Sequence, residues 1–132
     1  RNMETLGAES FTGCSALEKI VIPEGITSID DYAFYMADGL REVFLPESIL
    51  RIGEHAFENC ENLRTLTVPA GVTEIGENAF ARCDHLECVT VLSYDAEIGE
   101  GALDDCGIVR CHEGSPVWEY CEEACVDCEP IE

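Results

Sequence analysis

The sequence predicts an α/β solenoid in which each 23-residue unit contributes one short parallel strand and one short helical segment. The first observation is an aliphatic residue at every 23rd position, at Leu6, Ile29, Ile52, Ile75 and Ile98. The second is a column five residues later, at Phe11, Phe34, Phe57, Phe80 and Leu103. The third is an alternating apolar pair that proline closes, at residues 20–23, 43–46 and 66–69. Columns of this regularity indicate stacked, equivalent units.

The third unit, residues 52–74, shows how one repeat is expected to be built. Its first half carries apolar residues at helix-like spacings, at Ile52, Ala56, Phe57, Cys60 and Leu63. Its second half alternates Leu66 and Val68 with threonines, which is the period-2 pattern of a strand, and Pro69 ends that strand. One unit cannot bury its apolar face alone, so the units must stack with their strands in a parallel sheet.

Two further columns describe how the units approach one another. A small residue precedes each aromatic position, at Ser10, Ala33, Ala56, Ala79 and Ala102. We interpret it as room for the helical segment to approach the sheet, with the aromatic rings stacked between the layers. Glycine follows the aliphatic column at Gly7, Gly53, Gly76 and Gly99, where the chain turns. Asp30 takes this place in the second unit, and Asp tolerates left-handed backbone better than most residues.

The two ends of the chain differ. Near the C-terminus, Ser115 is a predicted helix N-cap and Pro116 the first helical residue. The apolar face of this helix is Val117, Tyr120, Cys121 and Ala124, and we expect it to cover the open end of the solenoid. Residues 1–5 match the end of a further unit, so we expect more repeats before Arg1.

The repeat pattern IGxxAFxxCxxLxxLxVP, fullest at residues 52–74 and 75–97, resembles the BspA-like leucine-rich repeat family. Residues 89–106 and 112–129 are similar to the last repeat and the terminal cap of that family. The resemblance implies a leucine-rich-repeat solenoid, with five repeats over residues 1–111 and a helix–strand cap over residues 112–132. It also implies an extracellular or cell-surface protein, commonly bacterial, with a role in adhesion and in binding host proteins.

Composition excludes several classes of function. The chain has 28 acidic residues against 7 lysines and arginines, a net charge of −21. A field this negative repels nucleic acids and anionic membrane surfaces. No run of 18 apolar residues occurs, so we expect no membrane insertion of this segment.

No catalytic pattern is present in the sequence. His55, His85 and His112 occupy different repeat positions, and no serine or acid recurs beside them at a triad-like location. A Gly-rich phosphate loop and a G-x-S-x-G motif are also missing. We therefore predict a non-enzymatic protein without a cofactor.

The acidic residues Asp31, Glu54, Glu77 and Glu100 share one exposed repeat position. One interpretation is a weak calcium ladder, and the other is a solvated acidic face that maintains solubility. Calcium requires six or more oxygen ligands, which this column does not offer. The sequence favours the solvated face, and no metal site is predicted.

Nine cysteines fall into two groups. Cys14, Cys60, Cys83 and Cys106 occupy one inward column, where we expect buried free thiols. The later group is Cys88, Cys111, Cys121, Cys125 and Cys128, with a C-x3-C-x2-C spacing at its end. That spacing also binds the cluster of radical enzymes that use S-adenosylmethionine, and three cysteines with Cys111 or His112 are a zinc alternative. One disulfide is a further alternative, while the inward positions of Cys121 and Cys128 favour packing.

The outward face of the predicted sheet is the candidate functional surface. We predict a protein-binding site at Lys19, Val21, Glu42, Phe44, Thr65, Thr67 and Thr90, centred on the adjacent Val21 and Phe44. The simpler interpretation is that Val and Phe stand there for strand propensity alone. The predicted function is protein recognition by part of a larger leucine-rich repeat protein. The alternative is a structural spacer that projects another domain.

Overall fold

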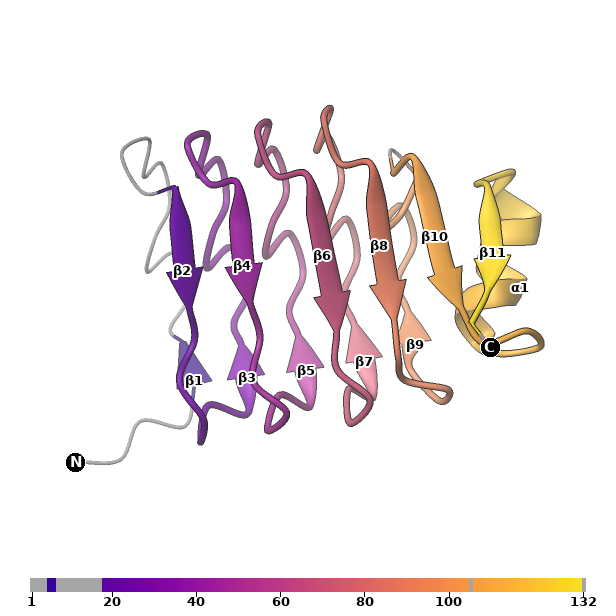
Figure 1. Ribbon diagram of the computed structural model, residues 1–132, viewed down its shortest axis with the longest axis horizontal. Coiled ribbons are helices and arrows are strands. Elements are labelled where there is room, and N and C mark those ends of the chain that lie inside the picture. Colours follow the sequence, from indigo (N-terminus) through magenta and orange to yellow (C-terminus); the bar gives the residue numbers. More distant parts are fainter. Residues whose placement is uncertain (1–4, 7–17, 105, 132) are drawn as a thin grey trace.

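The computed structural model describes residues 5–6, 18–104 and 106–131, with the backbone alone for residues 5 and 6 (Figure 1). The chain winds as a solenoid whose successive turns lie side by side, and a single helix covers the C-terminal end (Figure 1). The predicted solenoid with its helix–strand cap is therefore confirmed. Phe11 and Cys14, which the sequence places in the core columns, lie outside the described residues.

Two parallel sheets run along opposite sides of the solenoid. The main sheet has the strand order β11-β10-β8-β6-β4-β2. Its strands are β2 (Lys19–Val21), β4 (Glu42–Phe44), β6 (Thr65–Val68), β8 (Cys88–Val91), β10 (Ile108–Cys111) and β11 (Cys128–Pro130). The second sheet, which the sequence did not predict, has five two-residue strands: β1 (Thr5–Leu6), β3 (Ser28–Ile29), β5 (Arg51–Ile52), β7 (Glu74–Ile75) and β9 (Glu97–Ile98).

The segment predicted to be helical is a run of turns in the described repeats, for example over residues 54–59. Left-handed backbone recurs at two repeat positions, at Tyr32, His55, Asn78 and Gly101 and at Met36, Asn59 and Arg82. A regular α-helix does not pass through left-handed residues. The amide groups donate to the next repeat instead, as Phe57 N does to Ala79 O at 2.8 Å. Neighbouring repeats therefore satisfy one another's backbone on this side as well as in the two sheets.

A stack of phenylalanine rings forms the centre of the core. The ring centroids of Phe34 and Phe57 are 5.0 Å apart at an interplanar angle of 3°, and those of Phe57 and Phe80 are 5.5 Å apart at 6°. All three rings are fully buried, as are the alanines that precede them. Each stacked pair adds about 0.5–1.5 kcal/mol to the stabilisation from burial, so the aromatic column holds consecutive repeats together.

The glycine column has a different reason from the one expected. Gly53, Gly76 and Gly99 do not have left-handed backbone, and neither does Asp30. A Cβ atom on Gly76 would lie 2.5 Å from the backbone nitrogen of Glu54 in the preceding repeat. At Gly53, Gly76 and Gly99 the backbones of consecutive repeats approach too closely for a side chain, whereas Asp30 takes this position in the second unit.

The cap begins with α1 (Pro116–Ala124). Ser115 is its N-cap as predicted, and the Ser115 hydroxyl accepts a hydrogen bond from the Trp118 amide at 3.2 Å. Val117 and Cys121 face the core, but Ala124 is exposed, so the predicted apolar face ends one turn early. β11 then extends the main sheet beyond β10. In the described part of the chain, no helix has the length and apolar character needed to cross a membrane.

Candidate protein-binding face

The outward side of the main sheet brings all seven predicted binding residues onto one face. Strand register aligns Lys19 with Glu42, Glu42 with Thr65, and Thr65 with Cys88. A second outward row contains Val21, Phe44, Thr67, Thr90 and Arg110. Of the seven predicted residues, Thr90 is half-buried and the other six are exposed.

Val21 and Phe44 form the exposed apolar part of this face. Their exposed fractions are 64% and 47%, and the two residues are paired across β2 and β4. The other large apolar side chains that are exposed in the described residues are Met36, Leu50 and Tyr94, which lie outside the strands. Among these exposed side chains, Phe44 is the aromatic one that lies in a strand, so the sheet holds its backbone in place.

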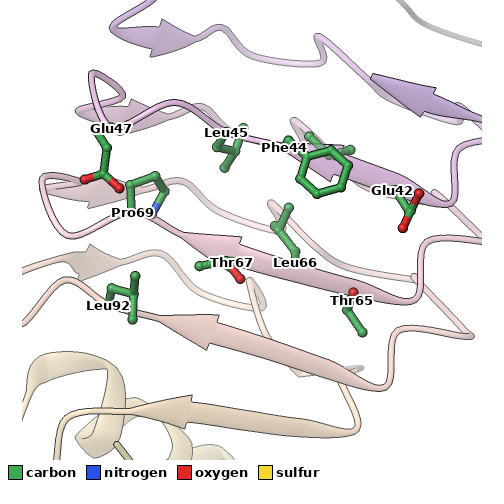
Figure 2. A pocket seen from close by; sticks show the side chains of 10 residues that line it. Glu42, Phe44, Leu45, Glu47, Thr65, Leu66, Thr67, Pro69 and Leu92 are labelled. Atoms are coloured by element: carbon green, nitrogen blue, oxygen red, sulfur yellow. The ribbon is translucent and has the colours of Figure 1, made fainter. Parts of the chain in front are cut away.

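The ladder between β4 and β6 is shorter than its neighbours. It registers the single pair Glu42–Thr65, whereas β2 and β4 register three pairs and β6 and β8 register four. A pocket of about 170 Å³ lies along this seam (Figure 2). Its lining residues come from β4, β6 and the segments that follow these strands and β8: Glu42, Val43, Phe44, Leu45, Glu47, Thr65, Leu66, Thr67, Pro69 and Leu92. Sequence periodicity gave no indication of this pocket, because the strands on either side carry the same repeat pattern.

A second, open hollow of about 580 Å³ adjoins the N-terminal ends of the strands. It is lined by Glu18, Lys19, Arg41, Glu42, Arg64, Thr65 and Glu87. Arg64 Nη1 lies 3.6 Å from Glu87 Oε2, while Arg41 makes no ion pair with any residue in the described ranges. Sequence reasoning missed Arg41 and Arg64, although the 23-residue column of Glu18, Arg41, Arg64 and Glu87 is visible in the sequence.

The acidic column lies beside the second sheet, on the other side of the solenoid. Its first member, Asp31, has a structural role, because Asp31 Oδ1 accepts a hydrogen bond from the Glu54 amide at 2.8 Å. Arg51 lies 3.3 Å from Asp31 and 3.6 Å from Glu74. Across residues 18–104 and 106–131, no group of three or more His, Cys, Asp or Glu side chains is placed to hold a metal ion.

Cys60 and Cys83 are buried free thiols, as predicted. Cys60 Sγ donates to Phe34 O at 3.2 Å, and Cys83 Sγ donates to Phe57 O at 3.1 Å. A hydrogen bond with Cys83, together with burial, raises the pKa of the Cys60 thiol. Cys106 is also a free thiol, but the prediction that it is buried is wrong: it is half-buried and packs against the edge of the core.

Cys88 and the cysteines of the last turn and cap are free thiols in the structure. Cys111 and Cys121 are buried, Cys88 and Cys128 are half-buried, and Cys125 is exposed. A hydrogen bond between Cys111 and Cys121 raises the pKa of Cys121 and lowers that of Cys111. These contacts show packing of the thiols between β10 and α1.

The three histidines have structural partners. His55 stacks on Tyr32, with ring centroids 4.7 Å apart, and its Nδ1 contacts Glu58. His85 Nδ1 is hydrogen bonded to Glu61 O at 2.7 Å, and His112 Nε2 to Leu92 O at 2.9 Å. These contacts join neighbouring repeats or stay within one turn, so they account for the histidines as structural residues.

Comparison with known proteins adds family information to this geometry. The family model of the BspA type leucine-rich repeat region matches residues 1–128 in six copies. Comparison with curated proteins gives no significant match. Such leucine-rich repeat solenoids are generally non-enzymatic.

Three solved structures share the fold. A leucine-rich repeat protein of T. pallidum has a TM-score of 0.75 and 27% identity, covering 80% of this chain and 51% of that one. A leucine-rich repeat protein of Bacteroides ovatus has a TM-score of 0.69 and 26% identity, covering 97% and 40%. The pneumococcal vaccine antigen PcpA has a TM-score of 0.77 and 18% identity, covering 98% and 39%.

The chain thus spans between 39% and 51% of the length of these three structures. Its repeats match the family over nearly their whole extent, and its two-sided parallel solenoid is the fold of the solved relatives. The chain belongs to the BspA-type leucine-rich repeat family.

Proposed function

We propose that this chain is a non-enzymatic recognition segment of a larger cell-surface or secreted protein. In this proposal the outward face of the main sheet binds a protein partner through Lys19, Val21, Glu42, Phe44, Thr65, Thr67 and Thr90. Leucine-rich repeat domains generally mediate protein binding, which supports this class of function. Adhesion through this face is the specific role that we propose.

The observation that carries the proposal is the exposed Val21–Phe44 pair on a rigid parallel sheet. An aromatic side chain loses little conformational entropy on binding, because it has few rotatable bonds and its backbone is already ordered. Aromatic anchors of this kind supply much of the energy of protein interfaces. Phe44 therefore has the properties of an interface centre.

The distribution of charge favours the same face. Arg1 lies outside the described residues, and four of the other basic residues lie on the main-sheet side: Lys19, Arg41, Arg64 and Arg110. The second sheet instead borders the acidic residues Glu54, Glu74, Glu77 and Glu97. The main-sheet side also carries Glu18, Glu42 and Glu87, but its basic side chains offset these acids, so a partner meets a less acidic surface there.

The proposed location at a bacterial surface has separate support. One structural relative is a pneumococcal vaccine antigen, and the other two are bacterial leucine-rich repeat proteins. Surface exposure would bring the main-sheet face into contact with host or matrix proteins. The bacterial surface location and a host or matrix protein as partner are both part of what we propose.

A binding screen followed by mapping tests the proposed function. The immobilised chain is offered purified extracellular matrix proteins in biolayer interferometry, and hydrogen exchange then locates each bound protein. We expect protection of β2, β4 and β6. Protection of the second sheet would contradict the proposed face, and absence of any specific binder would favour the structural spacer.

A further inference from the structure

We propose that the groove between β4 and β6 binds an extended peptide segment of the partner, with an apolar side chain and one carboxylate four residues apart. This inference rests on the proposed function and specifies the chemistry of the ligand. The groove has an apolar end and an arginine-lined end, and the two ends share Glu42 and Thr65 as lining residues.

The apolar end has the size of one large side chain. Val43 and Leu66 are buried beneath it, and Leu45 and Leu92 are half-buried at its side. Its volume is about 170 Å³, and an apolar cavity of roughly 150 Å³ holds a benzene molecule. A leucine or phenylalanine side chain of the partner therefore fits the pocket between Phe44 and Pro69 (Figure 2).

The pocket is open because the two strands separate after their first residues. β4 and β6 register at Glu42–Thr65 only, while β6 continues in register with β8 as far as Val68–Val91. β6 therefore stays alongside β8 and diverges from β4. A ligand side chain can enter this seam without breaking a registered strand pair.

The arginine-lined end holds Lys19, Arg41 and Arg64 beside the acids Glu18, Glu42 and Glu87, so its affinity for a carboxylate depends on how its arginines are paired. Arg41 has no ion-pair partner within the described part of the chain, and the Arg64–Glu87 pair is solvent exposed, with 56% and 69% of the two side chains accessible. An exposed pair of this kind contributes little to stability, so a ligand carboxylate can replace Glu87 at Arg64. Arginine also binds a carboxylate through two parallel hydrogen bonds.

One carboxylate suits this groove better than an acidic run. Glu42 lies between the two ends, and the whole chain carries a net charge of −21. A ligand with several acids would meet this repulsive field, whereas a single carboxylate meets Arg41 and Arg64 locally. Charge therefore limits the ligand to one acid at the arginine-lined end.

The spacing follows from strand geometry. Arg41 precedes Leu45 by four residues, and Arg64 precedes Thr67 by three. An extended ligand lying along the seam rises by about 3.3 Å per residue, as the strands themselves do. Side chains of an extended strand alternate between its two faces, so an acid and an apolar side chain that both face the groove are separated by four residues.

Selection from a random dodecapeptide phage library against the folded chain tests this inference. We expect enriched peptides to carry Asp or Glu four residues from Leu, Ile, Met or Phe. A synthetic peptide of the enriched sequence is then titrated against three variants. Thr67→Trp fills the pocket and should weaken binding at least tenfold, and Arg41→Gln should weaken it about fivefold.

Thr90→Trp is the matched control, because Thr90 is paired with Thr67 in the same outward row but does not line the pocket. It should change the affinity less than twofold. Circular dichroism melting curves verify that each variant is folded. Absence of enrichment, a consensus without an acid, or unchanged affinity for Thr67→Trp and Arg41→Gln would overturn the inference.

The outcome for the groove can be separated from the outcome for the binding face. If no peptide obeys the spacing rule but Phe44→Ala still weakens binding of a protein partner, the groove inference is wrong and the proposed function stands. If the partner also binds Phe44→Ala normally and protects the second sheet, both are wrong.

Discussion

Lys19 Nζ lies 5.3 Å from the centroid of the Phe44 ring, across the registered pair of strands β2 and β4. This is the distance of a cation–π contact. The contact restrains the ring before a partner arrives, and Lys19 also lines the hollow with Arg41 and Arg64. The aromatic anchor and the basic side chains therefore belong to one continuous surface.

We predict that Phe44→Ala weakens binding of a protein partner by about 30-fold, which corresponds to about 2 kcal/mol. Lys19→Met should cause a smaller loss, of about threefold, because it removes the restraint on the ring and one positive charge but leaves the ring in place. Isothermal titration calorimetry measures both. Glu77→Ala on the other side of the solenoid should have little effect. A larger loss from Glu77→Ala would indicate a charge-driven interaction with the acidic side.

We predict that Gly76→Ala destabilises the fold by about 1–3 kcal/mol, since the added methyl group overpacks a backbone contact. The new Cβ would lie 2.5 Å from Glu54 N and 2.6 Å from the carbonyl carbon of Gly53. Gly71→Ala is the control, because its Cβ would meet no atom closer than Glu47 O at 3.6 Å. The control should be neutral or stabilising by up to about 1 kcal/mol. Urea denaturation followed by circular dichroism distinguishes the two, and equal stabilities would refute the close approach.

We predict that Cys60→Ala costs about 1–2 kcal/mol, the loss of a small buried group. Ala37 occupies the same column in the preceding repeat, so the core accepts this side chain. In native protein a thiol reagent should label the exposed Cys125 rapidly and Cys60 only on unfolding. Burial and a raised pKa both keep Cys60 protonated and out of reach at pH 8. Rapid labelling of Cys60 would show that the inward register of this column is wrong.

We predict that removal of residues 113–132 causes aggregation or loss of cooperative unfolding. The truncation exposes the last turn, including the buried residues Val109 and Cys111, and leaves β10 as an open sheet edge. Size-exclusion chromatography and thermal denaturation test this. A truncated protein that stays monomeric with an unchanged Tm would show that the segment is not a cap.

In the full chain, Ser115→Ala should cost about 1 kcal/mol through loss of the N-cap.

The repeat architecture was accessible from the sequence because it depends on local periodicity. A 23-residue spacing of Ile52 and Ile75 requires the two residues to stack, and the structure pairs them in register. The outward position of Phe44 follows from the period of two in a strand, and the N-cap follows from Ser115 before Pro116. In each case the interactions that determine the feature lie within one repeat, or they recur identically in every repeat.

Other features depend on contacts between repeats that no single repeat encodes. The turns replaced the predicted helical segments because their amides donate to the following repeat, and the glycines are required by backbones that touch across repeats. The pocket beside Phe44 exists because β6 aligns with β8 further than with β4. Residue types predict that strands pair, but the relative twist and offset of neighbouring turns determine where a seam opens, and these emerge only when all the turns are packed together.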